Sequence, residues 1–169
     1  MTSLRPRVVL RANNGVNFVV AEAGGGGGVR ADRTAVGPGA WLELRLLVLS
    51  GGPPISGDRV ALGTSDGRHY LQAVGGGGAA LRASGESVGG FESFVIERSG
   101  GGLIRHGDGI TLRVNDTPWY VVAESGGGGN VFANSTARGG WETFKIFFVT
   151  PHLAPATGAA FELRIGGGR

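Results

Sequence analysis

The stretch that decides the fold is residues 119–146, which read WYVVAESGGGGNVFANSTARGGWETFKI. The same order of features occurs twice more, starting near residues 17 and 69: an apolar run, a glycine run, a short apolar segment, and an aromatic residue followed by another apolar run. The aromatics of the three copies are Trp41, Phe91 and Trp141, each 50 positions after the previous one. Agreement in both residue type and spacing indicates an internal threefold repeat.

Each copy contains four short segments with the composition of β-strands. In the third copy they are residues 109–114, 119–123, 130–133 and 142–148, in which apolar and polar residues mostly alternate. Alternation of this kind is typical of a strand with one buried face. Turn-forming residues such as Asp66-Gly67 separate the segments, and no window shows the period of a helix. The sequence therefore predicts an all-β protein of about twelve strands.

Three four-stranded repeats restrict the architecture. Three blades are too few to close a β-propeller, whereas a closed barrel with a hairpin cap accommodates both repeat length and copy number. We therefore predict a β-trefoil with three pseudo-symmetric four-stranded repeats in a single domain, residues 1–169. The repeats are expected at about 8–50, 57–100 and 107–150, with a C-terminal closing strand at about 160–165. The expected core consists of Val8, Leu10, Phe18, Leu44, Val60, Leu62, Tyr70, Phe94, Ile110, Leu112, Tyr120 and Phe144.

Composition fits one hydrophobic core and excludes several kinds of protein. The chain has 169 residues, 41% of them hydrophobic and 17% charged, with 35 glycines and no cysteine. This length suits a single core, and disulfide frameworks and thiolate metal sites are excluded. The net charge of +3 comes from scattered arginines, so we expect no nucleic-acid partner. No apolar run is long enough to span a membrane, and no membrane partner is expected.

The amino-terminal residues leave the localisation open. Residues 1–7 are basic, but only Val8, Val9 and Leu10 follow before Arg11, which is too short for the apolar core of a signal peptide. The two alternatives are a cytoplasmic protein and a secreted protein whose leader has been trimmed.

The glycine runs do not have the context of a phosphate-binding loop. Such a loop leads into a helix, and the P-loop ends in Gly-Lys-Ser/Thr, whereas each run here leads into another predicted strand with no lysine after it. Tight turns that require positive φ explain most of the glycine content. The recurrence of four or five consecutive glycines has no explanation at the level of sequence.

The aromatics that close the repeats are the candidate binding residues. A flat aromatic face at Trp41, Phe91 or Trp141 can stack on the apolar face of a pyranose ring. The acids Glu92 and Glu142, which follow two of them, can accept hydrogen bonds from sugar hydroxyls. The alternative is that the aromatics plug the open end of the barrel, and that the acids are structural and have buried partners.

Three further residues are secondary candidates. Glu22 and Glu124 precede glycine runs and are expected to border the same pockets. Trp119 adjoins Tyr120, so it faces the other way along the strand and is a candidate extra contact for the third site. Strict alternation would place Glu142 on the core side, unless a bulge or a turn ends there.

We expect no catalytic activity. His69, His106 and His152 occupy non-equivalent places in the repeats and suggest no triad. A glycosidase needs two facing carboxylates, but Glu92 and Glu142 belong to different repeats of the barrel. No cluster of histidines and acids suggests a metal site, and no cofactor is expected.

The third copy resembles the fascin-like β-trefoil superfamily. The resemblance is carried by Tyr-Val-Val-Ala-Glu, the glycine run, Val-Phe-Ala-Asn and Gly-Trp-Glu-Thr-Phe within residues 120–144, and it extends over about residues 8–149. The long glycine runs and Trp-Glu pairs are most similar to carbohydrate-binding module family 92. This similarity implies binding of β-1,6- and β-1,3-glucan through up to three sites. Leu42 replaces the acid after Trp41, so the third site is expected to be the strongest.

The leading expectation is a non-catalytic, multivalent, lectin-like domain that binds β-glucan. Aromatic stacking and carboxylate hydrogen bonds would hold the polysaccharide, and several weak sites would act together on a polymer. We expect a monomer, and one alternative is a module detached from a glycoside hydrolase. The other alternative is a fascin-like cytoskeletal domain that binds actin, or another protein-interaction trefoil.

Overall fold

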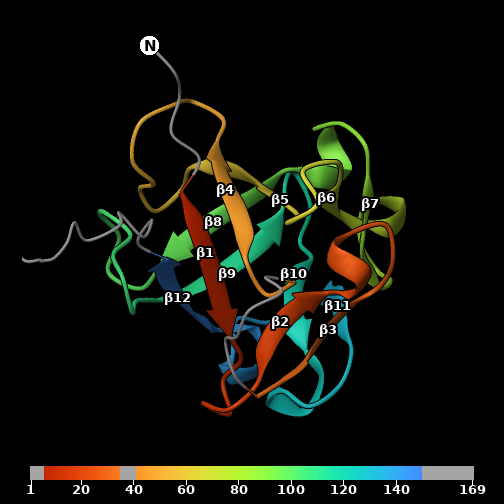
Figure 1. The fold of residues 1–169 in the computed structure, drawn as a ribbon. Helices are drawn as coiled ribbons and strands as arrows, with labels where there is room; N and C mark the ends of the chain where they lie inside the picture. Colours follow the sequence, from red (N-terminus) through yellow and green to blue (C-terminus); the bar gives the residue numbers. More distant parts are fainter. Residues whose placement is uncertain (1–5, 35–40, 150–169) are drawn as a thin grey trace, which may run out of the picture.

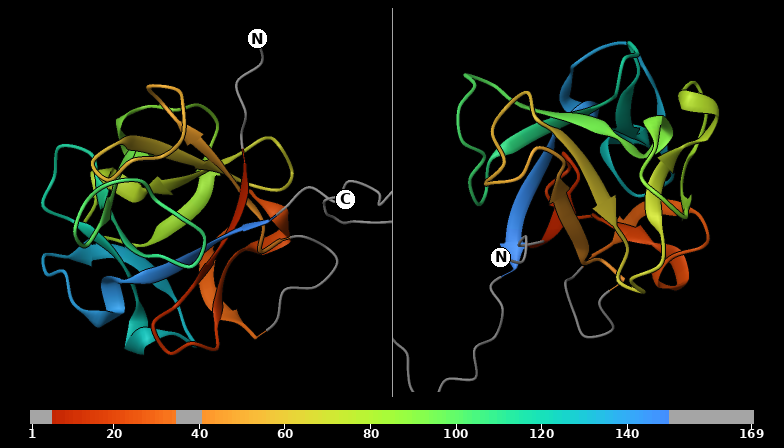
Figure 2. Two further views of the ribbon diagram at one scale, coloured as in Figure 1. Left: turned by 90° about the vertical axis from the view of Figure 1, so that its left-hand side faces the viewer. Right: turned by 90° about the horizontal axis from the view of Figure 1, so that it is seen from above.

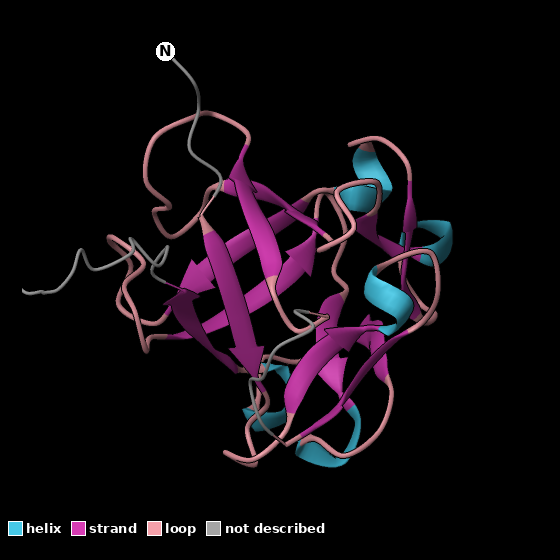
Figure 3. Cartoon of the chain, in the orientation of Figure 1, coloured by secondary structure: helices cyan, strands magenta, loops and turns pink. Residues whose placement is uncertain are grey.

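The computed structural model describes residues 6–34 and 41–149. These residues form twelve strands and five single-turn 3₁₀ helices (Figures 1 and 3). The predicted closing strand at about 160–165 lies outside the described residues. Within the described ranges, no helix has the length and apolar character needed to cross a lipid bilayer. The strands are β1 (Arg7–Arg11), β2 (Phe18–Ala21), β3 (Val29–Arg33), β4 (Leu44–Val48), β5 (Arg59–Gly63), β6 (Tyr70–Ala73), β7 (Leu81–Gly85), β8 (Phe94–Arg98), β9 (Gly109–Val114), β10 (Tyr120–Ala123), β11 (Val131–Ser135) and β12 (Phe144–Val149).

Six of the strands close a barrel. β1, β4, β5, β8, β9 and β12 each pair with two neighbours, and the pairing of β12 with β1 closes the circle. The other six form the hairpins β2–β3, β6–β7 and β10–β11 outside the barrel. Figure 2 (left) shows the three repeats as sectors around a common axis. This arrangement is the β-trefoil that the repeat pattern predicts, and the absence of edge strands in the barrel follows from its closure.

The barrel strands fill the core as their alternation predicts. Every predicted core residue on a barrel strand is at most 2% exposed: Val8, Leu10, Leu44, Val60, Leu62, Phe94, Ile110, Leu112 and Phe144. Large apolar side chains of all three repeats therefore meet in one cluster. A single core of this kind makes the repeats interdependent for stability.

The core-facing residues of the hairpin strands lie one position later than predicted. Phe18, Tyr70 and Tyr120 are only partly buried, so the prediction that they form core layers is wrong. The following residues enter the core instead: Val19 at 2%, Leu71 at 1% and Val121 at 3% exposure. Successive side chains point to opposite faces of a strand, so a shift of one residue inverts the pattern. The pairing of each hairpin also shifts after the tyrosine or phenylalanine, which a sequence pattern does not reveal.

The glycine runs connect the repeats through backbone hydrogen bonds. Each run lies against the second hairpin strand of the following repeat, and the run of the third repeat lies against the first. We call this set of contacts the inter-repeat ring. Its six hydrogen bonds are Gly26 N to Ala83 O (2.7 Å), Ala83 N to Gly27 O (2.8 Å), Gly78 N to Ala133 O (2.8 Å), Ala133 N to Ala79 O (2.9 Å), Gly128 N to Ala31 O (2.8 Å) and Ala31 N to Gly129 O (2.8 Å).

Conformation and space explain why the glycines are consecutive. The central residues Gly25, Gly77 and Gly127 have φ of 135°, 121° and 134°, a region that other residues rarely enter. A Cβ on Gly25 would lie 2.5 Å from Asp66 Oδ2, and one on Gly127 would lie 2.5 Å from Asn14 Nδ2. The glycines on either side of each also have positive φ. The runs are thus a structural requirement of the inter-repeat ring.

Asp66 anchors the turn that faces the first glycine run. Burial of its carboxylate would raise the pKa, but hydrogen bonds from Thr64 Oγ1 (2.5 Å), Arg68 N (2.8 Å) and His69 Nδ1 (2.7 Å) outweigh it. The pKa of Asp66 is consequently lowered from 3.8 to about 2. The folded state therefore binds its proton less readily than the unfolded state. This contribution to stability is fully present above the unfolded pKa and is lost as the pH falls through the folded pKa.

We expect Asp66→Asn to lower the free energy of unfolding by about 1–2 kcal/mol at pH 7, after allowing for solvent screening. The deficit should shrink between about pH 4 and pH 2, because the wild-type carboxylate becomes protonated there. Urea unfolding of both proteins across this pH range measures the difference. Equal stability of the two proteins at pH 7 would contradict the assigned role of the carboxylate.

Candidate functional site

The three repeat-closing aromatics lie on the surface. Trp41 is 43% exposed, Phe91 48% and Trp141 52%. Phe91 and Trp141 occupy the middle of the 3₁₀ turns η3 (Gly90–Glu92) and η5 (Gly140–Glu142), directly before the barrel strands β8 and β12. Exposure at this level excludes the alternative that the aromatics plug the barrel. Rings held on short turns above a rigid barrel are suited to contact with a ligand.

Each aromatic ring lies against the glycine run of its own repeat. A Cβ on Gly24 would come within 3.4 Å of Trp41 Cδ1, one on Gly76 within 3.0 Å of Phe91 Cε1, and one on Gly126 within 3.3 Å of Trp141 Cδ1. Each of these glycines is the last residue of a 3₁₀ turn. The turns are η1 (Glu22–Gly24), η2 (Val74–Gly76) and η4 (Glu124–Gly126). The ring edge therefore rests on backbone that carries no side chain. Sequence reasoning missed this contact, because it links positions about 15 residues apart.

Glu92 and Glu142 hold the turns that carry the aromatics. Each residue is 7% exposed. Oε1 of Glu92 accepts from Gly89 N (2.9 Å), and Oε1 of Glu142 accepts from Gly139 N (2.7 Å). Their Oε2 atoms accept from Gln72 Nε2 (2.7 Å) and Ser135 Oγ (2.7 Å), respectively.

These contacts are the buried partners that a structural role requires. The turn η5 ends at Glu142, which resolves the conflict with strict alternation. A direct sugar contact by either acid stays a prediction, and the geometry favours support of the neighbouring ring. In the first repeat Leu42 takes the equivalent place and is 6% exposed in a small apolar cluster.

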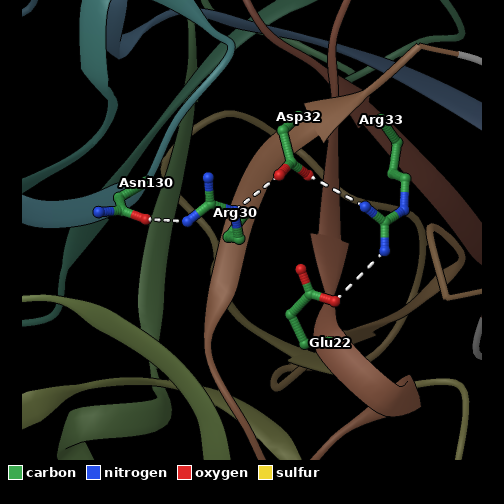
Figure 4. Close-up of polar contacts among 5 residues, drawn as sticks. All are labelled: Glu22, Arg30, Asp32, Arg33 and Asn130. Carbon is green, nitrogen blue, oxygen red and sulfur yellow. Dashed lines mark hydrogen bonds and ion pairs between the residues drawn. The ribbon is translucent and has the colours of Figure 1, made fainter.

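A charged network begins beside Trp41. The guanidinium of Arg33 lies 6.0 Å from the centre of the Trp41 ring. Its Nη2 is 3.3 Å from Glu22 Oε1 and its Nη1 is 3.3 Å from Asp32 Oδ1. Figure 4 shows how these side chains face one another. The predicted site residue Glu22 is thus brought to Trp41 through Arg33. The arginine offers both a cation beside the ring and hydrogen-bond donors.

The network continues into the third repeat. Arg30 Nε donates to Asp32 Oδ2 at 2.7 Å, and Arg30 Nη1 donates to Asn130 Oδ1 at 2.6 Å (Figure 4). The hydrogen bond with Asp32 raises the pKa of Arg30. These contacts join the first and third repeats beside the inter-repeat ring.

The structure gives the two remaining candidates different surroundings. Glu124 is exposed and begins η4, two residues before the glycine that Trp141 contacts. Trp119 is partly buried against the main core, and its ring covers Gly77 and Gly78 of the second repeat. Trp119 therefore packs at the junction between the second and third repeats. Its predicted contribution to the third site gains no support from these contacts.

The histidines and acids do not gather into a metal centre within the described ranges. His69 pairs with Asp66 in its turn, and His106 Nδ1 accepts from Phe148 N at 3.0 Å. His152 lies outside the described residues. The two resolved histidines thus have local structural partners in different parts of the barrel.

Comparison with known proteins shows the fold. No family model matches the chain, and no curated protein matches it in sequence. A designed threefold-symmetric protein, ThreeFoil, aligns with a TM-score of 0.62 at 15% identity, over 83% of this chain and 97% of its own. The SDF2-like protein from Arabidopsis thaliana aligns with a TM-score of 0.65 at 12% identity, over 85% and 93%. Part of the S. cerevisiae protein O-mannosyltransferase Pmt1–Pmt2 complex aligns with a TM-score of 0.65 at 12% identity, over 86% and 25%. Similarity at this level of identity supports a β-trefoil fold and leaves the ligand to the chemistry of the site.

Proposed function

We propose that this protein is a non-catalytic, multivalent carbohydrate-binding domain that recognises β-glucan with β-1,6 or β-1,3 linkages. The observation that carries the proposal is the exposure of Trp41, Phe91 and Trp141 at equivalent turns of the three repeats. Large aromatics are usually buried, so three exposed ones at symmetric positions point to a binding role. The choice of β-glucan rests on the similarity of the Trp-Glu repeats to carbohydrate-binding module family 92.

Each site combines an apolar face with different polar neighbours. The indole or phenyl ring packs against the C–H face of a hexose. In the first site, Arg33 lies beside Trp41 and Glu22 is ion-paired with Arg33, so both can bond with hydroxyls. In the third, Glu124 has no ion-pair partner among the described residues and is exposed near the turn that supports Trp141.

The second site is expected to be the weakest. Its aromatic is Phe91, and Val74 occupies the place of Glu22 and Glu124. A phenyl ring offers less stacking area than an indole, and valine offers no hydrogen bond. The sites would act together on a long polysaccharide, which raises apparent affinity by avidity.

A panel of insoluble β-1,3-, β-1,4- and β-1,6-glucans tests the proposal. We expect the domain to be retained on the β-1,6 and β-1,3 polymers and to be competed off by their soluble oligosaccharides. The affinity for a single disaccharide unit should be lower than the apparent affinity for the polymer by about tenfold or more, because avidity is lost. Absence of retention on every glucan would overturn the proposal.

One observation favours an alternative, a protein-interaction trefoil. Ile55 and Leu103 pair across two loops at the end of the barrel and are 48% and 42% exposed. Leu49, in the preceding strand-to-loop segment, is 41% exposed. Exposed apolar groups of this kind can receive a protein partner. Co-sedimentation with filamentous actin separates this alternative from glycan binding. A domain that binds actin would pellet with the filaments, whereas a domain that binds only glycan would stay in the supernatant.

The proposed mode of action needs neither a cofactor nor a second subunit. We propose a monomer, with a module detached from a glycoside hydrolase as the related possibility for its biological context. The carboxylates Glu92 and Glu142 are occupied by their own turns, which supports a binding role rather than paired acid and base chemistry.

A further inference from the structure

A groove on the outer wall of the barrel is lined by polar groups that the proposed sites do not use. It has a volume of about 400 Å³ and is lined by residues of β8, β9 and the loop that leads into β12. These three strands are neighbours in the barrel (Figure 1). This volume falls within the usual range of small-molecule sites. The lining residues are Glu97, Ser99, Gly109, Ile110, Thr111, Arg138 and Thr143.

Two polar atoms in the groove lack hydrogen-bond partners. Thr111 is 6% exposed, and its Oγ1 makes no hydrogen bond with any described residue. Oε1 of the neighbouring Glu97 is also shielded from solvent and accepts no hydrogen bond, whereas the Glu97 side chain as a whole is 24% exposed and forms an ion pair with Arg138 Nη1 at 3.9 Å. Glu97 and Thr111 face each other as directly paired residues of β8 and β9. A buried polar atom without a partner, such as Thr111 Oγ1, is uncommon in a folded protein.

The fold itself does not require this polar pair. The last strand of each repeat pairs with the first strand of the next, and we call each such pair of strands a junction. The equivalent residue pair is Leu47–Ala61 at the first junction, between β4 and β5, and Phe147–Val9 at the closing junction, between β12 and β1. Two of the three symmetric positions are therefore apolar. At the remaining position Glu97 and Thr111 introduce polar atoms that the fold does not need. Local departures from the pattern of a fold are expected at functional sites.

We infer that the groove is a second kind of binding site, which takes one neutral, polyhydroxylated ring such as a hexose. Glu97 supplies a carboxylate acceptor, Thr111 supplies a hydroxyl that can donate or accept, and Arg138 supplies guanidinium donors. Opposite charges on Glu97 and Arg138 balance, which favours an uncharged ligand over an anion or a cation. The choice of a hexose rests on the proposed function, whereas the groove and its unbonded atoms do not.

The groove differs from the proposed sites in how it recognises a sugar. No exposed aromatic is among its lining residues, so recognition there depends on hydrogen bonds to the ring hydroxyls. The hydroxyl of Thr143 already donates to Gly139 O at 2.9 Å. The unbonded atoms of Glu97 and Thr111 are shielded from solvent, so a ligand in the groove reaches them only after a neighbouring side chain moves aside. Arg138 and Thr143 flank the turn of Trp141 in sequence, so the two kinds of site share one loop.

Titration with a β-1,6-linked glucose disaccharide, followed by amide and indole NMR shifts, tests the inference. We expect two groups of shifted resonances in the wild-type protein, one at the Trp41 and Trp141 indoles and one at Glu97 and Thr111. Glu97→Leu combined with Thr111→Ala copies the pair of the first junction and should remove only the second group. The same variant should unfold about 2–8 °C higher, because buried unbonded atoms are removed. Thr111→Val is a nearly isosteric second variant. It should lower the affinity reported by the second group of resonances at least threefold.

The outcomes separate this inference from the proposed function. Indole shifts without groove shifts would overturn the groove and leave glycan binding intact. Groove shifts without indole shifts would support the groove and overturn the aromatic sites. Loss of both groups in Trp141→Ala would show that the groove does not act as a site of its own. No shift anywhere would overturn both ideas.

Discussion

Replacement of Trp141 by alanine is expected to lower the affinity of this domain for β-glucan by at least about tenfold. Truncation of a tryptophan at the centre of a contact typically costs about 2 kcal/mol or more, and about 1.4 kcal/mol corresponds to a factor of ten. The third site combines the most exposed indole, at 52%, with an exposed acid near the turn that supports it. Avidity increases the effect on an insoluble polymer, because one contact of several is lost.

The measurement is the fraction of protein retained on insoluble β-1,6-glucan, with thermal unfolding as the control for folding. Trp141 is half exposed, so its removal should lower the unfolding temperature by no more than about 4 °C. Leu103→Ala is a matched control, because Leu103 is 42% exposed and lies on a loop at the barrel end. Full retention of Trp141→Ala would contradict the site assignment, and reduced retention of Leu103→Ala would indicate a different surface.

Alanine at Gly77 is expected to destabilise the domain by about 3–5 kcal/mol. The backbone there has φ of 121°, and strain of this kind costs about 1–3 kcal/mol for a residue with a side chain. The new Cβ would also lie 2.7 Å from Cγ of Trp119, whose ring is packed against the core. Overpacking of this kind adds about 1–3 kcal/mol. The free energy of unfolding in urea measures the loss, which is a large part of an ordinary domain stability.

Gly75→Ser provides a control in the same glycine run. Gly75 has φ of 67°, and a Cβ added to it would meet nothing within 4 Å. The equivalent residue of the third repeat is Ser125, which has φ of 56°. We therefore expect a loss below about 1 kcal/mol, since the third repeat already accommodates this substitution. Comparable losses in the two variants would refute the view that contact with Trp119 dictates glycine at position 77.

The sequence predicts the barrel well because its strands obey two local rules. Alternation along β4, β8 and β12 places Leu44, Phe94 and Phe144 in the core, as the structure confirms. The copy number then selects the closed threefold architecture. The hairpin strands fail the same test, since Phe18 and its equivalents lie just before a shift in strand pairing. Such a shift depends on the partner strand, which a single segment of sequence does not contain.

The candidate site is only partly visible in the sequence for a related reason. The spacing of Trp41, Phe91 and Trp141 identifies the aromatics, and their exposure agrees with a surface role. The adjacency of Glu142 to Trp141 suggests that both face a ligand. A short turn instead directs the carboxylate inward, where its oxygens bond to Gly139 and Ser135. The unbonded pair Glu97–Thr111 is also invisible without the strand register.

The inter-repeat ring has a consequence for how many repeats such a chain can hold. A solenoid can gain or lose units at its ends, because each unit contacts only its neighbours and the terminal units are capped. Here the run at Gly128 and Gly129 returns to Ala31 of the first unit, so the series has no terminal member. Two units would leave backbone groups unbonded, and a fourth would have to break the circle to enter it. A unit therefore cannot be added to this protein or removed from it without opening the circle of hydrogen bonds, in contrast to a unit at the end of a solenoid.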